Sequence, residues 1–524
     1  MNVGQMQHRR STDEAYEVGL SRVREAVISS HFMHRISQNT DWHLYAEGQF
    51  DARRLEIDET TLTGGLLPAL KSACTTYCQR RVDAARRRAR EHFRDYGLES
   101  ANDVGVSEYI TEAILDKEFS RNASRYYEKT TLNGRLKWLI QNRRPIEMVI
   151  PALPFKIPSP LKARGTLPDL GEASFLLSLY EIARVVESLY DADLAPRPPV
   201  LASFTVVSDG LRFNDAVNTS REEVGRYQSA LAAWIRRLDL EAYVRIVDYE
   251  QLLRDRLSEQ ERAEKAHLFQ SAHADYSRTL WPIFDPYDVF EALEAAARVE
   301  LDPERDNPQG RFVALLKSLI FTLNYRTLEK LDGVPEPVLT DLYRELTSNI
   351  FRPYTRIAKT EVAGFAAPVH GPASRADMSP EFLERLRQAM LHEAWEAAIC
   401  YIAEIKSDRD RDQDPILACL PGHLRWTIHR KRGQIAISTP PILGMAVQAW
   451  AGSAVFRPAG KDKIRLCTLP ALLLEADGAI PVVLKSQDDG SRQPLFYIDS
   501  RLGISDIDGL LVALGSAFTR QRFS

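Results

Sequence analysis

The sequence has few cysteines and no long apolar run. Five cysteines occur in 524 residues, and they are scattered along the chain. An odd number of scattered cysteines argues against a disulfide framework and is typical of a reducing compartment. No apolar run approaches the roughly 20 residues that a membrane span needs, so the sequence predicts no transmembrane helix. The first residues lack the apolar stretch of a secretory signal, and we therefore expect a cytoplasmic protein.

Signals for a metal, a nucleotide or a nucleic-acid partner are also missing. Cys74 and Cys78 lie one turn apart, but no second Cys or His pair accompanies them, so no metal site is expected. There is no glycine-rich phosphate fingerprint, and hence no indication of a nucleotide cofactor. The formal net charge of -4 argues against a dedicated nucleic-acid binder. Seven arginines between Arg80 and Arg94 indicate a solvated helix face, with a contact surface for RNA, DNA or an acidic partner as the alternative.

The composition is that of an ordinary globular protein. Hydrophobic residues make up 44% and charged residues 27% of the chain, and its length predicts two or three domains. We divide it into a helical N-terminal region (residues 1–140), an α/β core with a helical insert (141–405) and a β-rich C-terminal part that completes the site (406–524). The predicted fold class is α/β, with a Rossmann-like parallel sheet as its core.

The core prediction depends on a strand–helix–strand pattern. Ile146–Ile150 is a short apolar run closed by Pro151, and Val200–Val207 is a second β-rich run. Between them, residues 170–189 have the apolar spacing of a helix, and a third strand is expected at Tyr243–Val247. Right-handed crossovers would place these strands in one parallel sheet. Ligands of such sheets bind at the carboxyl ends of the strands.

Acidic candidates lie at this edge. Asp169 and Glu172 are three residues apart at a helix start, where they can simply cap the helix. Alternatively, one of them holds a substrate ammonium group or moves protons. Asp209 follows the second strand and adds an acid from another element, although an Asx-turn before Gly210 also explains it. Asp215 lies in the following loop and is a weaker, substrate-binding candidate.

Basic candidates come from three segments. Lys156 follows the first strand and could neutralise a carboxylate or phosphate, or form an imine with a carbonyl. Arg425 and His429 alternate on the polar side of a predicted strand, where they offer a fixed cation and a group that titrates near neutrality. If that side of the strand faces solvent, Arg425 and His429 are only the exposed polar residues of a half-buried strand. Arg356, in a predicted loop, is a further candidate for binding an anionic group.

Three strings resemble a known family in their order and spacing. They are LPFKIPS (153–159), PDLGE (168–172) and VSDGLRFND (207–215), followed by an Arg/His strand near the C-terminus. Together they resemble the isocyanide (isonitrile) synthases, whose relatives include the pyoverdine and dityrosine biosynthesis proteins. The clear resemblance covers Trp138 to about Asp248. Many relatives carry a Thr-Pro-Trp-His string after the Arg/His strand, whereas this chain keeps Trp450 and lacks the histidine.

The resemblance implies an enzyme of natural-product biosynthesis. It would convert the amino group of an L-amino acid such as tyrosine or tryptophan to an isonitrile, with ribulose 5-phosphate as carbon donor and co-substrate. No metal or other cofactor is implied, and the partners are small molecules and downstream tailoring enzymes. Lys156, Arg356 and Arg425 would bind anionic groups, Asp169, Glu172 and Asp209 would serve the amine and proton transfers, and His429 would act as acid/base. A different carbon–nitrogen bond-forming enzyme on the same scaffold and a non-catalytic binding or scaffold protein remain as alternatives.

Overall fold

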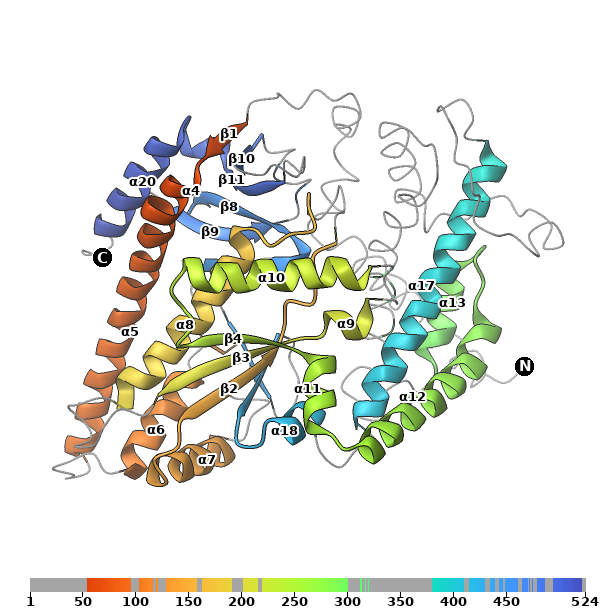
Figure 1. The fold of residues 1–524 in the computed structure, drawn as a ribbon, viewed down its shortest axis with the longest axis horizontal. Coiled ribbons are helices and arrows are strands. Elements are labelled where there is room, and N and C mark those ends of the chain that lie inside the picture. The colour runs from red at the N-terminus through yellow and green to blue at the C-terminus, as the bar shows by residue number, and fades with distance from the viewer. Residues whose placement is uncertain are drawn as a thin grey trace, which may run out of the picture. The chain divides into compact units, whose positions relative to one another are not determined.

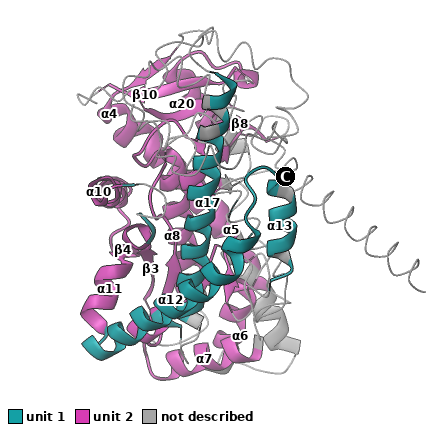
Figure 2. Cartoon of the chain, turned by 90° about the vertical axis from the view of Figure 1, so that its right-hand side faces the viewer, with its two compact units in different colours: residues 1–50, 213–219, 257–415 teal, residues 51–212, 220–256, 416–524 magenta. Residues whose placement is uncertain are grey.

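The computed structural model describes most of the chain. The described residues are 54–95, 103–115, 119–120, 129–157, 163–190, 201–214, 219–299, 312, 316, 319, 379–409, 414–428, 434–438, 443–445, 448–459, 464–469, 471, 474, 478–485 and 493–520. They form two compact units, each made of discontinuous segments (Figure 2). Unit 1 comprises residues 1–50, 213–219 and 257–415, and unit 2 comprises residues 51–212, 220–256 and 416–524. The three-part division made from the sequence stays a prediction.

The first sheet of unit 2 is parallel throughout. Its strand order is β4-β3-β2-β5-β6, and Figure 1 shows β2, β3 and β4 side by side. The strands are β2 (Ile146–Pro151), β3 (Ala202–Ser208), β4 (Val244–Asp248), β5 (Leu424–Thr427) and β6 (Ile435–Ala436). The predicted α/β class with a parallel sheet is therefore confirmed. The strand predicted around Arg425 joins this sheet directly, because β5 pairs with β2.

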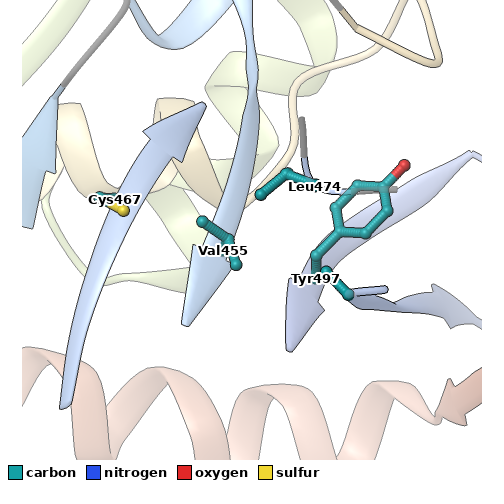
Figure 3. Packing of buried hydrophobic residues seen from close by; sticks show 5 residues of the cluster. Val455, Cys467, Leu474 and Tyr497 are labelled. Carbon is teal, nitrogen blue, oxygen red and sulfur yellow. The ribbon is translucent and has the colours of Figure 1, made fainter. Parts of the chain in front are cut away.

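A second, mixed sheet in unit 2 holds most of the C-terminal strands. Its order is β1-β10-β11-β8-β9-β7, with β1 (Leu55–Ile57), β7 (Leu443–Met445), β8 (Ser453–Pro458), β9 (Ile464–Leu469), β10 (Ile480–Leu484) and β11 (Pro494–Ile498). Strands β8 and β9 pair antiparallel and form a hairpin. Figure 3 shows part of the packing on this sheet, where Val455, Leu474 and Tyr497 belong to one buried apolar cluster.

Helix α8 (Leu170–Tyr190) is the central element of unit 2. Every residue from 170 to 183 is buried, as expected of a helix that is apolar on most of its circumference. It packs against strands β3 and β4 of the first sheet, against β8 and β9 of the second sheet, and against the short helix η5 (Ala449–Ala451). The other crossover helix, α10 (Arg221–Arg237), begins with a capping box of Ser220 and Glu223.

The remaining helices are assigned as follows. In the N-terminal part and around the first sheet they are α4 (Glu59–Thr61), η1 (Leu62–Leu66), α5 (Leu67–Asp95), α6 (Asp103–Ile114), α7 (Lys129–Gln141), α9 (Gly210–Phe213) and α11 (Tyr249–Arg256). Toward the C-terminus they are α18 (Pro415–Cys419), η6 (Ser500–Leu502) and α20 (Ile507–Arg520). The described helices of unit 1 include α12 (Glu259–Leu280), η3 (Trp281–Ile283), α13 (Val289–Ala297) and α17 (Pro380–Arg409). Among described residues, no helix has the length and apolar character of a membrane span.

Two loops at the carboxyl edge of the first sheet approach each other closely at Gly210. A Cβ atom there would lie 2.2 Å from the carbonyl oxygen of Pro154 and 2.8 Å from Cγ1 of Val224. Both distances are well inside van der Waals contact, and one of them is to backbone. The loop after β2 can therefore pass beside the end of β3 only if residue 210 has no side chain.

We expect Gly210→Ala to destabilise the protein by about 1–3 kcal/mol, because the added methyl group must push apart two packed backbone segments. Gly225→Ala is the matched control, since nothing lies within 4 Å of its Cβ position on α10. That substitution should stabilise the helix by about 0.5–1 kcal/mol. Urea denaturation of both variants measures the difference, and equal stabilities would show that the loops can move apart freely.

Candidate functional site

The loop after β2 turns sharply and sends Lys156 into the interior. Leu153 has a positive φ of 58° and is fully buried. This left-handed conformation costs a non-glycine residue about 1–2 kcal/mol. Its carbonyl oxygen accepts a hydrogen bond of 3.0 Å from the Ser208 hydroxyl at the end of β3. The neighbouring strand therefore helps to hold the turn that buries Lys156.

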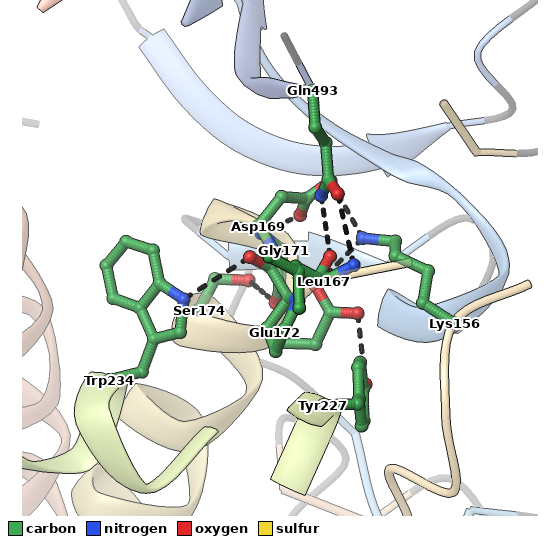
Figure 4. A network of polar contacts seen from close by, with 10 residues as sticks. Lys156, Leu167, Asp169, Gly171, Glu172, Ser174, Tyr227, Trp234 and Gln493 are labelled. Atoms are coloured by element: carbon green, nitrogen blue, oxygen red, sulfur yellow. Dashed lines mark hydrogen bonds and ion pairs between the residues drawn. The ribbon is translucent and has the colours of Figure 1, made fainter. Parts of the chain in front are cut away.

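Lys156 lies between two carboxylates (Figure 4). Its Nζ is 2.8 Å from Oδ2 of Asp169 and 3.0 Å from Oε2 of Glu172. The side chains of all three residues are at most 2% exposed. An ammonium group that is removed from water needs such partners, because an unpaired buried charge is strongly destabilising. The structure thus brings together three of the residues predicted from the sequence.

The two acids also cap α8. Oδ1 of Asp169 accepts the backbone N–H of Gly171 at 2.6 Å, and Oε2 of Glu172 accepts the backbone N–H of Asp169 at 2.9 Å. Asp169 thus caps the N–H of the second helical residue, and Glu172 bonds back to the backbone of the N-cap residue, so the capping interpretation is confirmed. The ion-pair interpretation also holds, since the same carboxylates contact Lys156. One short sequence therefore both starts the helix and places two acids at one cation.

Side chains from other elements enclose this helix start. The hydroxyl of Tyr227, on α10, hydrogen-bonds to Oε1 of Glu172 at 3.1 Å, and Nε1 of Trp234 donates to the carbonyl of Pro168 at 3.4 Å. Gln493, just before β11, clamps Leu167 through both amide atoms: its Nε2 donates to the carbonyl oxygen at 2.6 Å, and its Oε1 accepts the N–H at 3.0 Å. The first turn of α8 also packs closely against the second sheet, because a Cβ on Gly171 would lie 2.8 Å from Cγ2 of Thr468.

Sequence reasoning missed Tyr227 and Gln493. Tyr227 lies on the apolar face of α10 with Val224, Leu231 and Trp234, all of which are buried. A tyrosine on such a face usually finds a hydrogen-bond partner, and this was a usable signal. Gln493 is 326 residues from Leu167, and nothing in the local sequence marks it as a partner of that loop.

Burial sets the proton affinities of the cluster. Burial, with an addition from the Asp169 charge, raises the pKa of Glu172 to about 8, although the Lys156 charge opposes this shift. Burial alone would lower the pKa of Lys156, but Asp169 and Glu172 outweigh it, and the net shift is upward. Burial and the neighbouring Glu172 raise the pKa of Tyr227 well above its ordinary value. The pKa shifts therefore favour a charged Lys156 and a Glu172 that keeps its proton to a higher pH than an exposed glutamate does.

Hydrogen bonds fix both carboxyl oxygens of Glu172. Oε2 already accepts from Lys156 and from the backbone of Asp169. Oε1 accepts the hydrogen bond that the Tyr227 hydroxyl donates at 3.1 Å. Both carboxyl oxygens of Glu172 are therefore held in place by hydrogen-bond donors from other parts of the cluster.

The other predicted residues lie elsewhere or outside the described residues. Asp209 is half-buried directly after β3, between Ser208 and Gly210, both of which approach the loop that carries Lys156. It therefore emerges at the same sheet edge. Arg425 is half-buried on β5 opposite Val149, and its Nη1 donates to the carbonyl of Trp426 at 2.6 Å. Asp215, Arg356 and His429 lie outside the described residues.

Comparison with known proteins confirms the resemblance noted from the sequence. Residues 136–289 match the family described as pyoverdine/dityrosine biosynthesis protein. This stretch contains the cluster of Lys156, Asp169, Glu172 and Tyr227. The family match thus falls on the part of the chain that builds the candidate site.

Similar curated proteins are isonitrile synthases. An L-tryptophan isonitrile synthase of Fischerella ambigua is 29% identical over 108 residues, which are 21% of this chain and 31% of that protein. An L-tyrosine isonitrile synthase of Pseudomonas aeruginosa is 35% identical over 101 residues, or 19% and 28% of the two chains. The isocyanide synthase xanB of Aspergillus fumigatus is 30% identical over 143 residues, 26% of this chain and 17% of that one. The similarity thus spans about a third or less of each relative.

Among solved structures, the PvcA protein of Pseudomonas aeruginosa is similar with a TM-score of 0.43. The sequences are 18% identical, and the alignment covers 74% of this chain and 99% of PvcA.

The raised pKa of Glu172 predicts a pH-dependent stability. The folded protein holds a proton on Glu172 up to about pH 8, whereas the unfolded chain releases it near the ordinary value of 4.5. The stability gained from this difference is fully present below the pKa of Glu172 in the unfolded chain. It is lost as the pH rises through the pKa of Glu172 in the folded protein. Relative to wild type, Glu172→Gln should therefore lose less stability between pH 5 and pH 8. Urea midpoints measured across this range test the idea, and parallel curves for the two proteins would contradict it.

Removing the buried cation should be costly. Lys156→Met leaves Asp169 and Glu172 buried together without their counter-ion, and we expect a loss of about 3–5 kcal/mol of unfolding free energy. Arg221→Met provides the contrast, because the Arg221–Glu250 pair is largely exposed and should be worth at most about 1 kcal/mol. Adding Asp169→Asn to Lys156→Met should recover part of the loss. If it recovers none, the carboxylate charges are not the cause.

Proposed function

We propose that this chain is an isocyanide synthase-like enzyme. In this proposal it converts the amino group of an L-amino acid to an isonitrile, with ribulose 5-phosphate as the donor of the isonitrile carbon. The observation that carries the proposal is the Lys156–Asp169–Glu172 cluster, which lies at the carboxyl end of β2 and within the stretch matched by the family. The names of the similar proteins, which act on L-tryptophan or L-tyrosine, support an aromatic amino acid as substrate.

The first step of such a reaction needs a proton carrier. The substrate amine must lose a proton before it attacks the ketone of the sugar phosphate, and the resulting carbinolamine must gain a proton so that water can leave and the imine can form. A group that exchanges protons close to the working pH serves both transfers best. Glu172 has this property because burial raises its pKa to about 8. We assign it the role of acid/base in imine formation.

Lys156 is suited to a negatively charged group of a substrate. When Glu172 is protonated, its bond to Lys156 loses most of its electrostatic attraction, while Asp169 at 2.8 Å keeps the ammonium in place. A substrate carboxylate or phosphate could then replace Glu172 at the ammonium group. This exchange would free Glu172 for proton transfer at the moment the substrate binds. Asp169 is accordingly proposed to position Lys156 and the start of α8.

The remaining roles follow from the resemblance and from position. Asp209 emerges at the same edge and is proposed to bind the substrate ammonium group. Arg425 and Arg356 are proposed for anionic groups, Asp215 for substrate binding, and His429 as a second acid/base. No metal or other cofactor enters the proposed reaction, and the partners would be the two small-molecule substrates and a downstream tailoring enzyme. We place the reaction in the cytoplasm.

Two other functions compete with this one. A carbon–nitrogen bond-forming enzyme with another sugar phosphate or amine would use the same cluster, so that only the product distinguishes it. A non-catalytic binding protein would need the cluster for folding alone. The capping and ion-pair contacts would suffice for that. An enzyme and a non-catalytic binding protein would therefore differ in activity and not in stability.

The test is product formation by the purified chain. Incubation with ribulose 5-phosphate and a panel of amino acids, tyrosine and tryptophan included, should give a product with an isocyanide stretch in the infrared spectrum. Glu172→Gln keeps the shape and hydrogen bonds of the protonated acid, and should lower kcat about 100-fold or more because it carries no exchangeable acid proton. Asp209→Asn should raise KM for the amino acid. Glu222→Gln, an exposed acid on α10, is the control and should leave both constants unchanged.

A folded chain that yields no isocyanide with any amino acid of the panel would overturn the proposal. An isocyanide formed equally well by Glu172→Gln would leave the function in place and remove Glu172 from the chemistry. A different carbon–nitrogen product that depends on Glu172 would favour the second function.

A further inference from the structure

Three side chains in unit 1 gather their potential metal-binding atoms in one place. His273 comes from α12, and Glu396 and Cys400 lie one turn apart on the same face of α17. The two helices pack against each other along their length, and Figure 2 shows both within unit 1. His273 and Glu396 are 123 residues apart in the chain, so the sequence alone gave no sign of this cluster.

The separations of the atoms fit one tetrahedral ion. Nε2 of His273 is 3.0 Å from Oε1 of Glu396, and Sγ of Cys400 is 3.8 Å from the same oxygen. All three potential ligand atoms lie within 4.8 Å of one another. Around zinc, bonds of about 2.0–2.3 Å at tetrahedral angles place nitrogen and oxygen about 3.3 Å apart and sulfur and oxygen about 3.5 Å apart. Shifts of a few tenths of an ångström would bring these two separations to the zinc values, and the nitrogen–sulfur separation lies within the same 4.8 Å.

The kinds of ligand select the ion. An imidazole nitrogen, a sulfur and a single carboxylate oxygen suit a borderline-soft ion such as zinc, whereas magnesium and calcium prefer sets made of oxygen alone. Cys400 is a free cysteine and all three residues are half-buried. A metal ion could therefore reach the cluster from solvent without unfolding the helices.

An outer hydrogen bond orients the carboxylate. Nε1 of Trp281, in η3, donates to Oε2 of Glu396 at 3.1 Å, and this leaves Oε1 directed toward His273 and Cys400. Metal-binding carboxylates and histidines are commonly held by such second partners, which reduce the cost of arranging the ligands. The hydrogen bond between His273 and Glu396 could exist for helix packing alone. It does not explain why a thiol is directed at the same oxygen.

We propose that His273, Glu396 and Cys400 form a zinc-binding site that joins α12 to α17. Three protein ligands leave the fourth position to water. The site is independent of the carbon–nitrogen chemistry proposed above, because all three ligands belong to unit 1 and the Lys156 cluster belongs to unit 2. It also departs from the expectation of no metal drawn from the sequence, which rested on the cysteine spacing at Cys74 and Cys78.

The experiment measures zinc and cobalt binding by the full-length chain after treatment with a chelator. With zinc chloride, equilibrium dialysis and elemental analysis should give one zinc per chain at this site, and the melting temperature should rise with the zinc concentration. With cobalt chloride, a thiolate-to-metal charge-transfer band should appear in the near ultraviolet. This band reports on sulfur coordination, and the Cys400→Ser variant shows whether the sulfur is that of Cys400.

Variants then assign the ligands. Cys400→Ser should abolish the charge-transfer band, and His273→Ala should weaken zinc binding at least 10-fold. His267→Ala is the matched control, since His267 is an exposed histidine on the same helix α12, and it should bind zinc as the wild type does. Circular dichroism of each variant shows whether the chain keeps the helical content of the wild type. Isocyanide formation is not a readout here, so its failure would leave this test intact.

The proposal is overturned if the wild-type chain gives no cobalt charge-transfer band. It is equally overturned if zinc binding is unchanged by both His273→Ala and Cys400→Ser, because the metal would then occupy another place. Loss of binding in His267→Ala to the same extent as in His273→Ala would also contradict it.

Discussion

The buried ammonium group of Lys156 is the constraint on which the rest of unit 2 depends. Taking one charge out of water costs several kcal/mol unless close partners of opposite charge replace the solvent. Asp169 and Glu172 provide them, and both stand at the first turn of α8. Because α8 packs against both sheets, its first turn fixes where the cluster lies relative to each of them. The turn at Leu153, the gap left by Gly210 and the clamp of Gln493 on Leu167 can all be understood as means of keeping Lys156 in that place.

The three residues were accessible from the sequence because their chemistry is local. A lysine just after a strand and two acids at a helix start follow from periodicity and capping rules, and parallel crossovers bring them to one edge. The same rules located β2, β3 and β4. Each of these elements is defined by residues that are near one another in the chain, where patterns of two and of 3.6 residues are informative.

What the sequence did not reveal depends on contacts between distant segments. Tyr227 and Gln493 were missed because their partners are 55 and 326 residues away. The pairing of β5 with β2 was missed for the same reason, since the strand itself was predicted but not the sheet it joins. The pKa of Glu172 was also beyond prediction, because it results from complete burial, and burial is a property of the packed molecule. Asp209 was placed at the correct edge, and its role stays a prediction.

The first sheet of unit 2 has a consequence for the order in which a growing chain can assemble. Strands β2, β3 and β4 lie within about a hundred consecutive residues and can pair as soon as these are synthesised, whereas β5 and β6 are made only after the whole of the residues 257–415 that belong to unit 1. Until then the edge of β2 that β5 will occupy has no strand to pair with, and β1 must wait still longer for β10. Contacts between such remote segments slow folding and leave open strand edges that are prone to aggregate. Production of the chain should therefore favour slow synthesis at low temperature.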